Sequence, residues 1–157
     1  MKKFFLVLSA FITITAGIGC IKDTDGCRNK TVESEQAAIL AYASANGISG
    51  ASHSSGIYYQ VINPGSGFTP SVTSKVFVTY TGKLLDGTQF DAGTTPAEGW
   101  VLGSLIQGWQ IGLPLIQKGG TIKLIIPSSL AYGCTGKFTI PGNAILYFEI
   151  TLNDVQL

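Results

Sequence analysis

The residue types that most often carry out catalysis are sparse and scattered in this chain. The sequence has one histidine, His53, so a histidine-rich metal site is excluded and a histidine-based nucleophilic triad has no support. The serines lack the G-x-S-x-G pattern of a nucleophile, and the glycines lack the spacing of a phosphate-binding loop. The carboxylates offer no pair spaced for glycoside hydrolysis: Asp86, Asp91, Glu98 and Glu149.

The candidate site that remains is aromatic. Its members are spread over the second half of the chain: Tyr80, Phe90, Trp100, Trp109, Tyr132 and Phe148. Such a cluster is more often a hydrophobic core than a pocket, because aromatic rings bury large apolar areas. Taken alone, these residues support only a binding module for an apolar ligand.

Composition indicates one compact domain. Of the 157 residues, 45% are hydrophobic and 12% are charged, and the formal net charge is +1. The apolar content is too high for a disordered chain, and the length suits a single domain. No run of lysine and arginine could follow a phosphate backbone, so nucleic-acid binding is not expected.

The N-terminal residues have the order of an export signal. Residues 1–19 contain a short basic start, an apolar run and small residues at the end, which predicts a secretory signal peptide. Cys20 follows directly, and the arrangement resembles a bacterial lipoprotein signal, in which Cys20 would carry the lipid that anchors the protein to a membrane. Gly17 stands where leucine is usual, so a plain secretory signal is the alternative. We expect residues 20–30 to form a polar tether on an exported protein, either periplasmic or at the outer membrane or cell surface.

Two further cysteines, Cys27 and Cys134, lie far apart in the sequence. An exported compartment would permit a disulfide bond between them. Nothing in their spacing requires one, so two independent small residues are the favoured interpretation. No C-x-x-C redox motif is present.

Residues 31–46 are predicted to form an N-terminal helix. Thr31 is a candidate N-cap, acidic residues occupy the first turn, and Gly47 is a suitable stop. The small residues of the segment 47–56 then form a linker. The helix is therefore expected to be an appendage that precedes the domain at residues 57–157.

From Ile57 onward the hydrophobic period changes to two, which is typical of strands. Apolar side chains share one face in three sets: Val76, Val78 and Tyr80; Ile122, Leu124 and Ile126; and Ala144, Leu146, Phe148, Ile150 and Leu152. One helical segment, 105–113, interrupts the strands, and Pro114 should end or bend it. An α+β fold with one short helix packed on an antiparallel sheet accounts for this pattern.

Four separated motifs match a known family in order and approximate spacing. They are VTYTGKLLDGTQFD (78–91), IQGW (106–109), IIPSSLAYG (125–133) and IPGNAILYFEI (140–150). With these motifs, residues 57–157 resemble the FKBP-type peptidyl-prolyl cis-trans isomerases. The resemblance implies a twisted antiparallel sheet wrapped around one short helix, catalysis of rotation about the bond that precedes proline, and no cofactor or metal.

The resemblance also implies a pocket. Trp109 would form its floor, and the backbone N–H of Ile106 and the hydroxyl of Tyr132 would bind substrate carbonyls. Asp91 would be the charge at the rim, with a turn-capping role after Phe90 as the alternative. Its apolar walls would be Tyr80, Phe90 and Phe148. Further substrate contacts would come from Leu105, Ile140, Trp100 and Phe138.

The segment 94–99 departs from the family pattern, because neither Glu98 nor Gly99 can supply the usual wall side chain. Trp100 either compensates for this or belongs to the core. The departure leaves open a non-catalytic chaperone or peptide-binding surface module on the same scaffold. The expected partners are proline-containing unfolded or nascent exported polypeptides, with macrolide inhibitors as candidate ligands, and the protein is expected to be a monomer.

Overall fold

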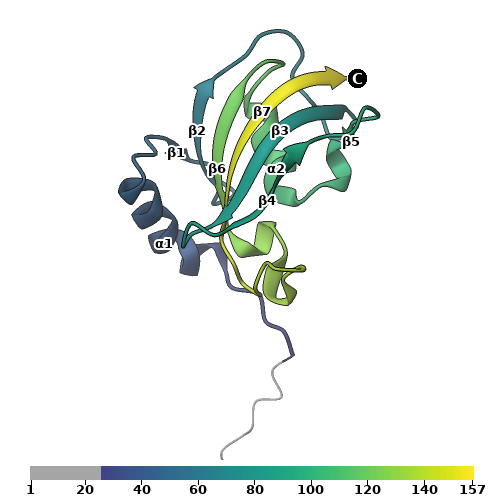
Figure 1. The fold of residues 1–157 in the computed structure, drawn as a ribbon. Coiled ribbons are helices and arrows are strands. Elements are labelled where there is room, and N and C mark those ends of the chain that lie inside the picture. The colour runs from purple at the N-terminus through teal and green to yellow at the C-terminus, as the bar shows by residue number, and fades with distance from the viewer. Residues whose placement is uncertain (1–25) are drawn as a thin grey trace, which may run out of the picture.

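The structure is a computed structural model that describes residues 26–157. The predicted signal peptide and Cys20 lie outside the described residues. Within residues 26–157, no helix has the length and apolar character needed to cross a membrane. The helices and strands, shown in Figure 1, are α1 (Val32–Ala45), β1 (Ala51–Ser52), β2 (Tyr58–Asn63), β3 (Lys75–Leu84), β4 (Gln89–Thr94), β5 (Trp100–Val101), α2 (Gln107–Gly112), β6 (Thr121–Ile126) and β7 (Leu146–Gln156).

The strands form one antiparallel sheet in the order β1-β2-β6-β7-β3-β4, with β5 paired to β3. The last strand, β7, lies between β6 and β3 (Figure 1). Four short 3-10 turns complete the regular structure: η1 (Leu102–Ser104), η2 (Leu113–Leu115), η3 (Ser128–Leu130) and η4 (Gly133–Thr135). The predicted α+β class, an antiparallel sheet with one short helix on it and a helix before it, is confirmed.

The main core lies between α2 and one face of the sheet. The period-two apolar sets of β3, β6 and β7 all contribute to it, as predicted. Gly108 and Gly112 let α2 approach β6 closely, because a Cβ on Gly108 would lie 2.4 Å from a carbon of Ile126, and one on Gly112 would lie 2.5 Å from a carbon of Leu124. The α-helix ends at Gly112, and Pro114 lies in the 3-10 turn that follows. Trp109 of α2 is thus held within this core.

The opposite face of the sheet is covered by α1. Thr31 caps this helix by accepting a hydrogen bond from the Ser34 N–H at 3.3 Å. A second core forms where Ile39 and neighbouring α1 residues meet Ile125 and Tyr147 of the sheet. The segment 47–56 is part of the fold, since β1 pairs with β2. Because Ile39 and its neighbours lie in the second core, α1 is packed on the sheet.

One charged residue of α1 is buried. Glu35 is 2% exposed, and its Oε2 accepts a hydrogen bond from the backbone N–H of Ser128 at 2.8 Å. Ser128 begins η3, so the carboxylate satisfies an N–H that has no partner within that turn. Through this contact, α1 supports the start of the loop that runs from η3 to β7.

Cys27 and Cys134 form a disulfide bond, with their Cα atoms 5.4 Å apart and a sequence separation of 107. The interpretation of these cysteines as two independent residues is wrong. The fold brings the tether against the loop between β6 and β7, where the Cys134 N–H donates to Asn29 Oδ1 at 2.8 Å. On the same loop, Asn143 Oδ1 accepts from the Lys30 N–H at 3.1 Å. The two segments meet only in the folded chain, so the spacing of the cysteines in the sequence could not indicate the bond.

Candidate functional site

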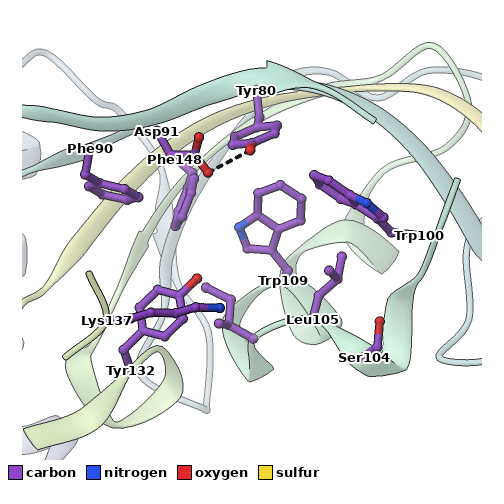
Figure 2. A pocket seen from close by; sticks show the side chains of 11 residues that line it. Tyr80, Phe90, Asp91, Trp100, Ser104, Leu105, Trp109, Tyr132, Lys137 and Phe148 are labelled. Carbon is purple, nitrogen blue, oxygen red and sulfur yellow. Dashed lines mark hydrogen bonds between the residues drawn. The ribbon is translucent and has the colours of Figure 1, made fainter. Parts of the chain in front are cut away.

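A cavity of about 350 Å³ opens between α2, the face of the sheet that packs on it and the loop that follows β6 (Figure 2). All the residues predicted for the pocket line it, except Phe138 and Ile140. The lining residues are Tyr80, Phe90, Asp91, Trp100, Ser104, Leu105, Ile106, Trp109, Tyr132, Lys137 and Phe148. The cavity is therefore mainly aromatic and aliphatic.

Trp109 lies at the centre of the cavity. It is on α2, is 4% exposed, and its ring centroid is 5.3 Å from the centroids of Tyr80 and Phe148. Both contacts are edge-to-face, with interplanar angles of 80° and 86°, a geometry that aromatic pairs prefer. Two neighbours thus fix the orientation of the indole.

One wall of the cavity depends on a glycine. The Phe90 and Phe148 rings meet edge-to-face, with centroids 5.5 Å apart. Gly82 lies directly behind them on β3, and a Cβ there would be 2.7 Å from carbons of Phe90 and 2.8 Å from a carbon of Phe148. Any side chain at this position would displace the two rings, so Gly82 provides the space for the wall.

The opposite wall contains Trp100. Its ring centroid is 5.9 Å from that of Tyr80 and 6.5 Å from that of Trp109. Trp100 lines the cavity and also packs against the main core, so the structure fits both interpretations left open for it. Glu98 and Gly99 do not line the cavity, so this tryptophan takes the place of the missing wall residue.

A hydrogen bond joins Tyr80 on β3 to Asp91 on β4, with the Tyr80 hydroxyl donating to Asp91 Oδ2 at 2.7 Å (Figure 2). The pKa of Tyr80 is raised far above its ordinary value, first by burial and then by this hydrogen bond and the negative charge of Asp91. A raised pKa keeps the hydroxyl protonated at neutral and mildly alkaline pH. The pair therefore holds the Asp91 carboxylate in a fixed direction at the rim.

The segment before α2 presents a free backbone donor. Gln110 Nε2 donates to the carbonyl oxygens of Leu105, at 2.7 Å, and Gly103, at 3.2 Å, and so holds this turn in place. Ile106 is the next residue and precedes the first turn of α2. Within residues 26–157 its N–H donates to no acceptor. The cavity wall thus contains an unused N–H of fixed direction.

Tyr132 enters the cavity from the loop between η3 and η4. Burial raises the pKa of its hydroxyl, and the negative charge of Asp91 raises it further. The hydroxyl therefore remains a hydrogen-bond donor over the physiological pH range. Glu35 holds one end of this loop and the disulfide bond holds the residues just after Tyr132.

Two predicted contact residues lie elsewhere. Ile140 belongs to the core and is not among the residues that line the cavity. Phe138 does not line the cavity, because its side chain is 97% exposed to solvent. Sequence reasoning missed Ser104 and Lys137, which do line it. Ser104 ends the 3-10 turn η1 and Lys137 lies in the loop between β6 and β7, and no hydrophobic periodicity predicts the path of either segment.

In the part of the chain that the structure describes, no group of His, Cys, Asp and Glu side chains is arranged to hold a metal ion. The hydroxyls of Tyr80 and Ser104 already donate to Asp91 and to the Val101 carbonyl. The cavity offers apolar contact with rings, the Tyr132 hydroxyl, the backbone N–H of Ile106 and two charges. That set can bind a short, mostly apolar segment with carbonyl oxygens and can stabilise it in a fixed conformation.

Comparison with known proteins agrees with this description. Residues 67–153 match the family model of the FKBP-type peptidyl-prolyl cis-trans isomerases. The FKBP-type peptidyl-prolyl cis-trans isomerase FkpA of Escherichia coli K12 is 45% identical over 105 residues, which cover 66% of this chain and 39% of that protein. FkpA of Aeromonas hydrophila is 39% identical over 136 residues, covering 85% of this chain and 49% of that protein.

The crystal structure of Escherichia coli FkpA is similar with a TM-score of 0.68 and 36% sequence identity. The match covers 80% of this chain and 62% of that chain. This chain thus spans 39% of the length of the Escherichia coli relative and 49% of the Aeromonas one.

Proposed function

The chain belongs to the FKBP-type peptidyl-prolyl cis-trans isomerase family, and from this premise we propose that it catalyses cis–trans rotation of the peptide bond that precedes proline. The observation that carries the proposal is the cavity over Trp109, which combines aromatic walls with the unused N–H of Ile106 and the hydroxyl of Tyr132. These groups match a prolyl segment, which offers an apolar ring and flanking carbonyl oxygens.

The reaction needs no nucleophile. The barrier to rotation is about 18–20 kcal/mol, because the planar amide loses its resonance when it twists. The twisted amide is less dipolar than the planar one, so an apolar cavity that excludes water stabilises it relative to the ground state. Lowering the barrier by about 6 kcal/mol would accelerate rotation roughly ten-thousand-fold.

Each part of the cavity has a proposed role in this reaction. The proline ring rests on the Trp109 indole, and the Ile106 N–H and Tyr132 hydroxyl bind the carbonyl oxygens on either side of the ring. These two contacts hold the flanking chain while the imide bond turns. Asp91 is fixed by the Tyr80 hydroxyl at 2.7 Å and orients polar groups at the rim.

The direct test is a protease-coupled assay on a short peptide that contains an X-Pro bond. The purified protein is expected to accelerate the slow cis-to-trans phase in proportion to its concentration, and rapamycin is expected to inhibit this acceleration by occupying the cavity. A folded protein that leaves the slow phase at the rate in buffer would refute the proposal.

Replacing Tyr132 by phenylalanine is expected to lower kcat/KM about three- to tenfold, which is the effect of losing one hydrogen bond. The midpoint of thermal unfolding should stay the same, because the ring is retained. Tyr42→Phe is the matched control, since it removes a hydroxyl on the opposite face of the sheet and should leave kcat/KM unchanged. An unchanged kcat/KM in Tyr132→Phe would remove the hydroxyl from the mechanism.

A non-catalytic chaperone on the same scaffold is the second candidate. The almost fully exposed Phe138 ring beside the cavity favours it, because an exposed aromatic side chain can bind unfolded chains without isomerising them. Refolding of a client protein that lacks proline separates the two functions. Suppressed aggregation of that client, with no acceleration in the peptide assay, would identify a chaperone only.

We infer that the protein acts on exported polypeptides. The Cys27–Cys134 disulfide supports this, because such bonds persist in oxidising compartments outside the cytosol. The signal-like sequence of residues 1–19 and the cysteine that follows support a lipid anchor at Cys20. Fractionation of expressing cells tests the anchor: the native chain should be in the membrane fraction and Cys20→Ser should be in the soluble fraction. Sedimentation of the purified domain tests the expected monomer.

A further inference from the structure

The cavity has two charged lining residues, and they lie on different sides of it. Asp91 belongs to the Tyr80 side, whereas Lys137 comes from the loop on the Tyr132 side (Figure 2). The Lys137 Nζ atom is 5.3 Å from the centroid of the Tyr132 ring and 5.6 Å from that of Phe138. The lysine side chain therefore extends across the tyrosine ring that is proposed to bind the substrate.

The two charges differ in what already binds them. The Asp91 carboxylate accepts the hydroxyl hydrogen of Tyr80 at 2.7 Å. The Lys137 ammonium makes its contacts with the faces of two aromatic rings, and among residues 26–157 no carboxylate lies within ion-pair distance of it. A ring face attracts a cation more weakly than a carboxylate that accepts a charge-assisted hydrogen bond from it. Lys137 thus presents an open positive charge beside the position of the substrate.

The backbone fixes the place of this charge. Lys137 and Ile140 exchange two hydrogen bonds, N–H to O at 3.0 Å and 2.8 Å, which close a tight turn. The buried Ile140 side chain fastens the turn to the core, and Cys134 ties the preceding residues to the tether. Because the backbone is already ordered, an ion pair with Lys137 costs mainly the side-chain entropy.

We propose that Lys137 is a specificity-determining residue, and that it makes prolyl peptides with an acidic residue next to the proline the preferred substrates. The proposal rests on the isomerase function proposed above. A carboxylate that flanks the proline would replace the ring contacts of the ammonium with an ion pair. The expected preference is modest, about two- to fivefold, because the lysine is exposed to solvent.

The test compares kcat/KM, measured by exchange NMR, for peptide pairs that differ only in glutamate against glutamine. One pair carries this difference before the proline and the other pair carries it after the proline. For the native chain, the Glu/Gln ratio of kcat/KM should be about two to five in at least one pair. It should fall to about one in roughly 1 M salt, where the screening length is about 3 Å.

Variants of Lys137 identify the source of the preference. Lys137→Gln should bring the ratio to about one, and Lys137→Glu should bring it below one, because like charges repel. Lys123→Gln is the matched control: it removes the same charge from β6 outside the cavity and should keep the native ratio.

The outcomes separate this inference from the proposed function. No acceleration of either neutral peptide would refute the isomerase function itself. If the neutral peptides are accelerated but the Glu/Gln ratio of kcat/KM is one in both pairs, the role of Lys137 is refuted and the isomerase function stands. A native preference that persists in Lys137→Gln would also refute it, since another group would then be responsible.

Discussion

Replacing Trp109 by alanine is expected to lower kcat/KM for a prolyl peptide about ten- to a hundredfold. Trp109 is 4% exposed, so the surface removed from water on binding is mainly that of the proline ring. Burial of an apolar side chain is worth roughly 1.5–3 kcal/mol, and that free energy corresponds to this loss of rate. The measurement is the protease-coupled assay, with the rate divided by the concentration of folded protein.

The same substitution should also lower the free energy of unfolding, by about 3–5 kcal/mol, because Trp109 is nearly fully buried. Leu113→Ala is the matched control for this effect. Leu113 is fully buried in the turn after α2 and does not line the cavity, so its loss should destabilise the fold by about 2–5 kcal/mol and retain kcat/KM. Equal kcat/KM in the two variants would contradict the role of the indole as the floor of the site.

Replacing Cys27 and Cys134 together by serine is expected to lower the free energy of unfolding by about 2–4 kcal/mol. The bond closes a long loop, because the two cysteines have a sequence separation of 107, and so it restricts the unfolded chain strongly. Urea denaturation with and without dithiothreitol measures the effect. The native chain in dithiothreitol should unfold at the urea concentration that unfolds the double variant.

The double variant supplies its own control, because dithiothreitol should not change the urea concentration at which it unfolds. If the native chain unfolded at the same urea concentration with and without reductant, the bond would contribute nothing to stability. A lower kcat/KM in the double variant under native conditions would further show that the tether helps to hold the Tyr132 loop in place.

The parts of the structure that follow local periodicity could be predicted from the sequence. The alternation in residues 121–126 and 144–152 placed the correct side chains toward the core, and Thr31 and Gly47 marked the ends of α1. The aromatic cluster was visible as a set of residues, and the resemblance to a known family assigned it to a pocket. The structure brings that set together around Trp109.

The features that depend on contacts between distant segments could not be predicted. The packing of α1 on the sheet depends on a small apolar surface around Ile39 and on one buried carboxylate, Glu35. In the sequence, Glu35 was visible only as an acidic residue in the first turn of the helix. The positions of Cys27 and Cys134 in the sequence do not indicate that the two residues form a disulfide bond. Lys137 lines the cavity because a tight turn directs it there, whereas its neighbour Phe138 is directed to solvent.

The position of β7 in the sheet constrains how this molecule can assemble. β6 and β3 both pair with β7 and not with each other, so a nascent chain without residues 146–156 consists of two unconnected groups of strands. Such an intermediate has no continuous core, and the ordering entropy of its long-range pairings is not yet compensated. The sheet therefore closes only after the final strand has been synthesised, so we expect the core under α2 to form late, once the whole domain is available.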